Sequence, residues 1–357
     1  MRVVQIIDSL EAGGAERMAV NLANALVGKI DLSGIIATRK EGVLKKQINS
    51  GVSYFSLEKK QKIDLKAVFR LRKYLVANQI DIIHAHSSSF FIAVLVKLTL
   101  PKIKIVWHDH YGSRAEESKD KSRILILLSG FFSSVFVVNL QLQEWNKKHL
   151  KCPKVIFIPN FATFQNQSTQ VTQLKGADGK RIVFLANLKN PKNHIFILKA
   201  FKDLKLNELG WSLHLIGRDY FDSYSDNIKQ FIKTHSLEND IHLYEAKSDI
   251  KYILSQASIG VLASTNEGFP VTLLEYGLEK LAVASTNVGH CPVIIRNNVD
   301  GLLFNPYSDS EVQEQLKTLT EDQSLREKLG NSLNQSVLEN YSEKVVIEKL
   351  ILAYKNA

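Results

Sequence analysis

The sequence has little cysteine and no long apolar run, and both absences narrow the class of protein. Cys152 and Cys291 lie far apart, so they provide neither a disulfide framework nor a four-thiolate zinc site. The chain reaches Asp8 after a short apolar run, which is shorter than the core of a signal peptide. The longest apolar stretches, 90–100 and 124–138, are interrupted by lysine or serine and are too short to span a membrane. We therefore expect a cytoplasmic protein without a transmembrane helix.

Length and composition favour an ordinary globular protein of two domains. The chain has 357 residues, of which 45% are hydrophobic and 23% are charged. These values exclude a disordered, collagen-like or coiled-coil protein. The length is about twice that of a typical domain, so two domains are expected.

The excess of positive over negative charge lies in the first half of the chain. Residues 1–165 hold 25 Lys and Arg against 13 Asp and Glu, whereas residues 166–357 hold 21 against 23. This asymmetry favours a polyanionic partner, either a phosphorylated substrate or an anionic membrane surface; a solvated basic face is the alternative. No zinc finger or aromatic RNA-binding motif accompanies the lysines, so we expect no nucleic-acid partner.

Short β-branched runs alternate with amphipathic stretches along the chain, a pattern typical of parallel α/β sheets. We predict an N-terminal domain over 1–165 and a C-terminal domain over 166–340, joined by a polar linker, with a last helix over 341–357 that packs back on the first domain. Helical periodicity is clear from Glu16 to Leu26. The predicted strands are 2–8, 34–38, 52–55, 80–86, 103–109, 134–139 and 154–158 in the first domain, and 181–186, 212–216, 241–244, 258–263, 281–285 and 301–304 in the second.

Ligands of open α/β sheets bind at the carboxyl ends of the strands, so the loops there are the candidate sites. After the first strand, Gly13 and Gly14 precede a helix, where backbone amides are free to approach an anion. An ordinary strand-to-helix turn explains the pair equally well. The loop matches neither a dinucleotide-binding fingerprint nor a P-loop.

Four histidines follow the ends of two neighbouring predicted strands: His84, His86, His108 and His110. Residues two apart on a strand share a face, so we expect them to gather at one sheet edge. Three interpretations remain open: a set of hydrogen-bonded histidines, a single acid–base or polar group, and a zinc or iron site.

The second half carries a basic loop and a pair of spaced carboxylates. Lys189 and Lys192 follow a predicted strand and could neutralise phosphates. Glu267 and Glu275 stand eight residues apart, around a Gly268–Pro270 turn that opens a helix. The helix amides could hold a diphosphate, and Glu275 could accept hydrogen bonds from a vicinal diol.

The carboxylate spacing resembles the E-x7-E motif of retaining nucleotide-sugar glycosyltransferases of family 4. These enzymes have the GT-B fold: two Rossmann-like, doubly wound parallel-sheet α/β domains facing a cleft. Other stretches resemble the family in the same order along the chain: 13–17, 110–112, 158–160, 189–192, 215–217 and 300–304.

The resemblance implies a role for each matching residue. Lys192 would pair with the donor diphosphate. The amides of Gly13 and Gly14 would approach either the donor diphosphate or the acceptor. Glu267, with the backbone of Gly268, Phe269 and Pro270, would hold the transferred sugar, and Glu275 would bind the ribose hydroxyls. His110 resembles the family's active-site histidine, with His108 as the second candidate.

Two positions depart from the family pattern. Asn187 replaces the usual arginine five residues before the lysine, and we expect Lys189 to compensate. The loop Gly289–Val293 lacks the usual carboxylate. No Asp-x-Asp motif occurs in the chain, so we expect a site without metal or other cofactor.

The resemblance implies an enzyme that transfers a sugar from a nucleoside diphosphate to a glycan or lipid-linked acceptor with retention, in cell-surface polysaccharide biosynthesis, at the inner face of the membrane. Three alternatives remain: a GT-B-type epimerase or phosphorylase, a metal hydrolase built on His84, His86, His108 and His110, and a non-catalytic sugar-binding protein.

Overall fold

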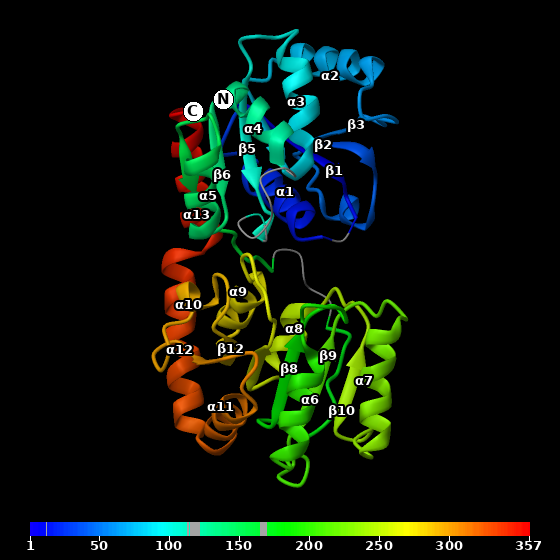
Figure 1. Ribbon diagram of the computed structural model, residues 1–357, viewed down its shortest axis with the longest axis vertical. Helices are drawn as coiled ribbons and strands as arrows, with labels where there is room; N and C mark the ends of the chain where they lie inside the picture. The colour runs from blue at the N-terminus through cyan, green and yellow to red at the C-terminus, as the bar shows by residue number, and fades with distance from the viewer. Residues whose placement is uncertain (12, 113, 115–121, 165–169) are drawn as a thin grey trace. The chain divides into compact units, whose positions relative to one another are not determined.

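The computed structural model describes residues 1–11, 13–112, 114, 122–164 and 170–357 (Figure 1). The chain divides into two compact units. The first unit contains Met1–Asn160 together with Glu343–Ala357, and the second contains Phe161–Ser342. The boundary expected between residues 165 and 166 lies outside the described residues.

The first unit contains a seven-stranded parallel sheet with the order β3-β2-β1-β4-β5-β6-β7. Its strands are β1 (Arg2–Ser9), β2 (Leu32–Lys40), β3 (Ser53–Ser56), β4 (Ile82–His86), β5 (Lys104–Asp109), β6 (Ser134–Val137) and β7 (Val155–Phe157). Its α-helices are α1 (Gly14–Ala25), α2 (Leu65–Ala77), α3 (Phe90–Lys97), α4 (Arg123–Leu128), α5 (Leu140–His149) and α13 (Glu343–Lys355). The strand order reverses between β1 and β4, which makes the sheet doubly wound.

The second unit contains a six-stranded parallel sheet with the order β10-β9-β8-β11-β12-β13. Its strands are β8 (Arg181–Leu185), β9 (Ser212–Ile216), β10 (Ile241–Tyr244), β11 (Ile259–Leu262), β12 (Ala282–Thr286) and β13 (Leu302–Phe304). Its α-helices are α6 (His194–Asp203), α7 (Ser223–Thr234), α8 (Ile250–Ser255), α9 (Val271–Leu278), α10 (Cys291–Ile294), α11 (Asp309–Glu321) and α12 (Gln323–Asn340). Here the order reverses between β8 and β11.

All thirteen predicted strands are present, with ends within two residues of the predicted ones. The prediction succeeds because both faces of a parallel sheet are covered by helices, so its strands are nearly continuous apolar runs. For example, every residue of β4, β9 and β12 is buried.

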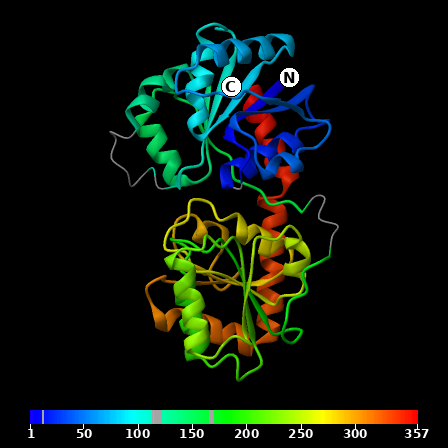
Figure 2. The ribbon, with the colours of Figure 1, turned by 90° about the vertical axis from the view of Figure 1, so that its right-hand side faces the viewer.

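The helix α13 belongs to the first unit although it follows the whole second unit in the sequence. It lies beside β1 in Figure 2, and its Val346, Ile347, Leu350 and Tyr354 are buried. The preceding helix α12 ends at Asn340, and α13 begins at Glu343, two residues after the predicted start at position 341. Among the described residues, the helices are too short or too polar to cross a membrane.

Candidate functional site

The point where the second sheet reverses its strand order brings the basic loop and the first carboxylate together. The Nζ of Lys192, in the loop after β8, lies 2.5 Å from Oε1 of Glu267, in the loop after β11. Ser264 Oγ donates a hydrogen bond to the same oxygen at 2.6 Å. The two loops are also joined by the Thr265 N–H, which donates to the carbonyl of Pro191 at 2.9 Å.

This ion pair is partly enclosed. The side chain of Lys192 is 24% exposed and that of Glu267 is 10% exposed. A charge pair that is removed from bulk water interacts more strongly than a surface pair and keeps a better defined geometry. The lysine is therefore held in place at the carboxyl ends of the strands, where α/β sheets bind ligands.

Glycine at position 289 allows the neighbouring loop to lie against Glu267. Gly289 has a φ of +54°, and a Cβ at this position would lie 1.7 Å from the Glu267 carbonyl oxygen. Any other residue would push this backbone away from Glu267. The loop Gly289–Val293 therefore lies against the Glu267 backbone although it lacks the carboxylate that is usual in the family.

Glu275 lies on α9, which begins directly after Gly268–Pro270. The residue is only 9% exposed. Its neighbour Tyr276 fixes the helix to the sheet, because its hydroxyl accepts a hydrogen bond from the Leu185 N–H at 2.9 Å and donates to the Val261 carbonyl at 3.1 Å. The phenol ring packs on Gly260, where a Cβ would lie 2.6 Å from it.

Phe269, between the two carboxylates, is packed away from solvent. Its ring stacks on His290 with a centroid distance of 5.0 Å and meets the edge of Tyr341 at 5.9 Å. Burial lowers the pKa of His290 to about 4, so this imidazole is neutral at physiological pH. Phe269 therefore supports the turn by packing, and only its backbone is a candidate for ligand contact.

Asn187 and Lys189 lie in the same loop as Lys192 but make separate contacts. Asn187 Oδ1 accepts a hydrogen bond from the Arg218 N–H at 2.9 Å, which links the loops after β8 and β9. Lys189 is exposed, and its Nζ lies 5.8 Å from the centre of the Tyr220 ring. The exposed Arg218 also stacks on Tyr220, with its Cζ 5.1 Å from the ring centre. Two cations therefore lie near Asn187, the position where the family has an arginine.

In the first unit, the four predicted histidines gather on one face of the sheet. His84 and His86 lie on β4, beside β5, where His84 pairs with Val106 and His86 with His108. His84, His86 and His108 are buried, and His110 is half-buried. Burial lowers the pKa of each, to about 3 for His110 and well below the usual value for the other three. All four imidazoles are therefore neutral at physiological pH.

Hydrogen bonds occupy most ring nitrogens of this histidine cluster. His84 Nε2 lies 3.1 Å from His108 Nδ1, and His86 Nδ1 lies 2.9 Å from His110 Nε2. Ring nitrogens of His84, His86 and His108 lie within 4.8 Å of one another, close enough to be considered as metal ligands. Internal hydrogen bonding is the interpretation that accounts for the distances, and it needs no ion.

Gly13 and Gly14 lie in the first unit, at the start of α1, and not in the unit that holds Lys192. A Cβ on Gly14 would meet no atom within 4 Å, so this backbone is open. A Cβ on Gly13 would lie 2.1 Å from Glu16 Oε2, which shows that the Glu16 carboxylate folds back to the helix start. That carboxylate has to move before an anion can approach these amides.

Sequence reasoning missed several polar residues near these loops. Ser264 and Tyr276 lie close in sequence to the E-x7-E carboxylates, so their position beside this motif could have identified them. Asp8, at the end of β1, accepts hydrogen bonds from Thr38 and Ser88 at 2.5 and 2.6 Å, which joins three strand ends of the first sheet. No signal in a single sequence marks Asp8, because its partners come from separate strands.

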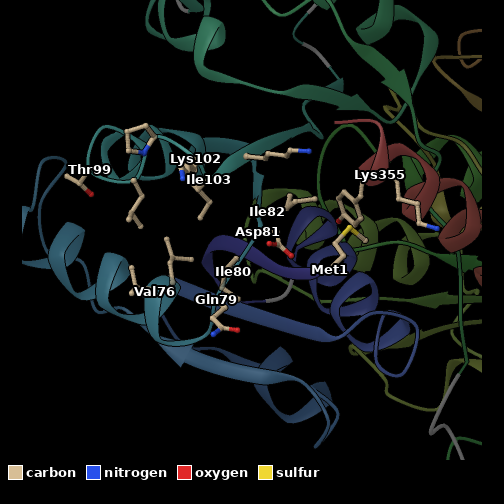
Figure 3. A pocket seen from close by; sticks show the side chains of 15 residues that line it. Met1, Val76, Gln79, Ile80, Asp81, Ile82, Thr99, Lys102, Ile103 and Lys355 are labelled. Atoms are coloured by element: carbon tan, nitrogen blue, oxygen red, sulfur yellow. The ribbon is translucent and has the colours of Figure 1, made fainter.

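A pocket of about 790 Å³ opens at the opposite edge of the first sheet (Figure 3). It is lined mainly by the ends of α2 and α3 and the starts of β4 and β5, with Met1 and Lys355 at one side. The pocket lies at the amino ends of the strands, and its lining includes Tyr354, whose hydroxyl lies 2.6 Å from His84 Nδ1.

The chain is similar to known glycosyltransferases. Residues 12–163 match the family model of "Glycosyltransferase Family 4", and residues 166–335 match that of "Glycosyl transferases group 1". A Campylobacter jejuni α-1,4-N-acetyl-D-galactosaminyltransferase, named for an undecaprenol-diphosphate-linked substrate, is 22% identical over the full length of both chains. An Escherichia coli diphosphoundecaprenol α-1,3-galactosyltransferase is 25% identical over 77% of this chain and 75% of its own.

Solved structures show the same fold. Anabaena HepE, in complex with UDP and glucose, superimposes with a TM-score of 0.83 at 17% identity over all of both chains. A Rickettsia africae glycosyltransferase gives a TM-score of 0.81 at 18% identity, covering 99% of this chain and 97% of its own. Glycosyltransferase family models match most of the chain, and both units are doubly wound, so the chain is a glycosyltransferase of the GT-B fold. It belongs to glycosyltransferase family 4, and a metal hydrolase is excluded as its class.

Proposed function

We propose that the protein transfers a sugar, with retention of configuration, from a nucleoside-diphosphate sugar to a lipid-linked acceptor in polysaccharide biosynthesis. The observation that carries the proposal is the Lys192–Glu267 ion pair at the strand-order reversal of the second sheet. It places a cation and a carboxylate side by side, as a leaving diphosphate and a transferred sugar require.

Lys192 neutralises the diphosphate as the glycosidic bond breaks. A preorganised cation in a site partly closed to water stabilises the developing charge without reorganisation. Arg218 and Lys189, which flank Asn187, provide the additional positive charge. We propose that these side chains and the helix amides act without a metal ion.

Glu267 then exchanges its partner when the donor binds. In the free protein it accepts hydrogen bonds from Lys192 and Ser264. When the diphosphate takes over Lys192, the Glu267 carboxylate becomes available to sugar hydroxyls. Glu275, on the buried side of α9, accepts from the ribose hydroxyls, and Tyr276 holds that helix on the sheet.

The proposed acceptor rests on the relatives and on the charge of the first unit. The Campylobacter and Escherichia relatives are named for sugars on undecaprenol diphosphate. The first unit holds 28 Lys and Arg against 15 Asp and Glu, whereas the second holds 18 against 21. A basic unit suits both an acceptor diphosphate and an anionic membrane that carries the lipid.

Helix α2 provides the surface for peripheral membrane binding. Leu65, Phe69 and Val76 are exposed by 66%, 63% and 53% on this helix, at intervals of four and seven residues. Lysines and arginines lie among them: Lys66, Arg70, Arg72 and Lys73. A helix with an exposed apolar face and basic flanks binds in the headgroup region of anionic membranes.

The decisive experiment uses the purified full chain and a panel of nucleoside-diphosphate sugars. The correct donor is identified by thermal stabilisation, because a ligand that binds only the folded state raises the melting temperature. A polyprenyl-diphosphate-linked sugar is then added, and the anomeric configuration of the product is read by NMR. An inverted product contradicts retention, and donor conversion without any acceptor favours the epimerase alternative. Release of a sugar phosphate by added phosphate favours the phosphorylase.

A further inference from the structure

A chain of buried hydrogen bonds connects the C-terminal helix α13 to His110. Tyr354, on α13, lies with its hydroxyl 2.6 Å from His84 Nδ1 and 3.3 Å from Gln5 Nε2. The other end of the Gln5 amide, Oε1, lies 2.9 Å from His86 Nε2, and His86 Nδ1 lies 2.9 Å from His110 Nε2. All five side chains belong to the first unit.

Neutral imidazole has one donor and one acceptor nitrogen, so each member of the chain fixes the next. If Gln5 Oε1 accepts from His86 Nε2–H, then His86 Nδ1 must accept from His110 Nε2–H. His110 is thereby left with an unprotonated Nδ1. If the Gln5 amide is turned over, every proton moves to the opposite nitrogen along the chain.

The distances distinguish the two arrangements. The 2.6 Å contact of Tyr354 with His84 is typical of an O–H donor, and the 3.3 Å contact with Gln5 fits a weaker N–H donor. Tyr354 therefore donates its proton to His84 and accepts from the Gln5 amide nitrogen, which turns Oε1 towards His86. A second branch of hydrogen bonds runs from Tyr354 through His84 to His108, and it ends at His108 Nε2, which has no hydrogen-bond partner.

We propose that Gln5 and Tyr354 are positioning residues that hold His110 in its Nε2–H form, with the Nδ1 lone pair presented as an acceptor to a substrate hydroxyl. The inference rests on the proposed function for the substrate contact of His110, but the tautomer itself is a property of the free protein. It makes the last helix of the first unit part of the support of the site.

A bound metal ion explains the same residues less well. An ion between His84, His86 and His108 would break the His84–His108 hydrogen bond and require lone pairs that the chain already uses.

The test is imidazole ¹⁵N NMR on the full chain with labelled histidine. The signal of His110 is assigned by its loss in His110→Asn. We expect the wild type to show protonated Nε2 and bare Nδ1. Gln5→Met preserves the side-chain volume but removes both hydrogen-bonding groups, so His110 becomes a mixture of tautomers. Gln5→Glu restores the pattern, because either protonation state of the carboxyl group offers His86 an oxygen acceptor.

Kinetics and a matched control complete the test. Gln5→Met lowers kcat roughly three- to tenfold while KM for the donor changes less than about twofold, and Gln5→Glu recovers most of the rate. Leu350 is a buried residue of α13 that takes no part in these hydrogen bonds. Leu350→Ala lowers the melting temperature but leaves the tautomer of His110 unchanged.

Four results overturn the proposal. They are a proton on Nδ1 of His110 in the wild type, a single unchanged tautomer in Gln5→Met, one equivalent of metal bound to the histidine cluster, and an unchanged kcat when the tautomer is lost. If no donor or acceptor gives transfer, the proposed function fails while the NMR experiment still decides the tautomer.

Discussion

The two units have the same architecture but opposite polar chemistry at the strand-order reversal. In the second unit, Lys192 and Glu267 form a partly buried ion pair there. In the first unit the reversal lies between β1 and β4, where Gln5 on β1 and His86 on β4 form a neutral hydrogen-bonded pair. The difference teaches that one fold can carry a charged pair at this point in one unit and a neutral hydrogen-bonded pair in the other, which matches the roles proposed above for the diphosphate and for hydroxyl groups.

The units also differ in how they bury histidine. The first gathers four imidazoles in one hydrogen-bonded cluster, whereas the second separates His194 and His290 from the pair His214 and His242. Burial lowers the pKa of each of these four as well. Protonation of one imidazole in the first unit raises the cost of protonating its neighbours, because they share one buried face.

Acidification gives the largest expected effect. An unfolded histidine binds a proton below pH about 6.5, but the folded cluster stays neutral, so stability is complete above that pH and falls as the pH is lowered. Each histidine that remains neutral at pH 4 costs roughly 3 kcal/mol of unfolding free energy. We expect the first unit to unfold first, detected by hydrogen exchange corrected for its intrinsic pH dependence. Earlier opening of β9 and β10 would reverse the comparison.

Removing the charge of the second unit is the next largest change. Lys192→Ala is expected to cost about 2–4 kcal/mol of transition-state stabilisation, which lowers kcat/KM roughly 30- to 1,000-fold. Lys189→Ala, in the same loop but exposed, serves as the matched control and should lose less than about fivefold. If the two variants lose the same activity, the ion pair has no special role and the contrast between the units disappears.

The two carboxylates of the second unit should separate turnover from binding. Glu267→Gln is expected to lower kcat about 10- to 100-fold with a small change in KM, because the proposed function assigns Glu267 to the transferred sugar. Glu275→Gln should mainly raise KM for the donor, since ribose contacts are alike in the ground and transition states. Steady-state kinetics with the identified donor measures both. Wild-type behaviour of both variants would remove the E-x7-E from the site.

The charge difference predicts that the first unit carries the membrane affinity. The full chain should sediment with vesicles containing acidic lipid and be released as salt rises to about 0.5 M, where the Debye length is a few ångström. Phe69→Ser on α2 should weaken this binding several-fold. Leu338→Ser, which changes an exposed leucine of α12, is the control and should have no effect. Equal retention on neutral vesicles would show that the basic residues are only solvated.

The smallest effect is expected at Asn187. Asn187→Arg loses the hydrogen bond from the Arg218 N–H, worth about 1 kcal/mol of stability, and adds a cation beside the proposed diphosphate. Donor affinity should change by less than about threefold, as measured by titration calorimetry. Abolished binding would show that this position contacts a part of the donor other than phosphate.

How far the sequence predicts this molecule depends on the range of the interactions. The strands follow from local apolar runs, and the four histidines share a face because the strand period is two. The pairing of Lys192 with Glu267 spans 75 residues and requires the sheet order, which single-sequence periodicity does not contain. The same holds for Tyr354 and His84, which are 270 residues apart.

The return of α13 has a consequence for synthesis on the ribosome. Residues 343–357 leave the ribosome only after the whole second unit has been made, so β1 and β4 must wait for the helix that covers their histidines. Domains usually fold in the order of their synthesis, but here the second unit can be complete while the first still exposes a sheet face. We expect nascent chains stalled before residue 343 to recruit chaperones to the N-terminal unit.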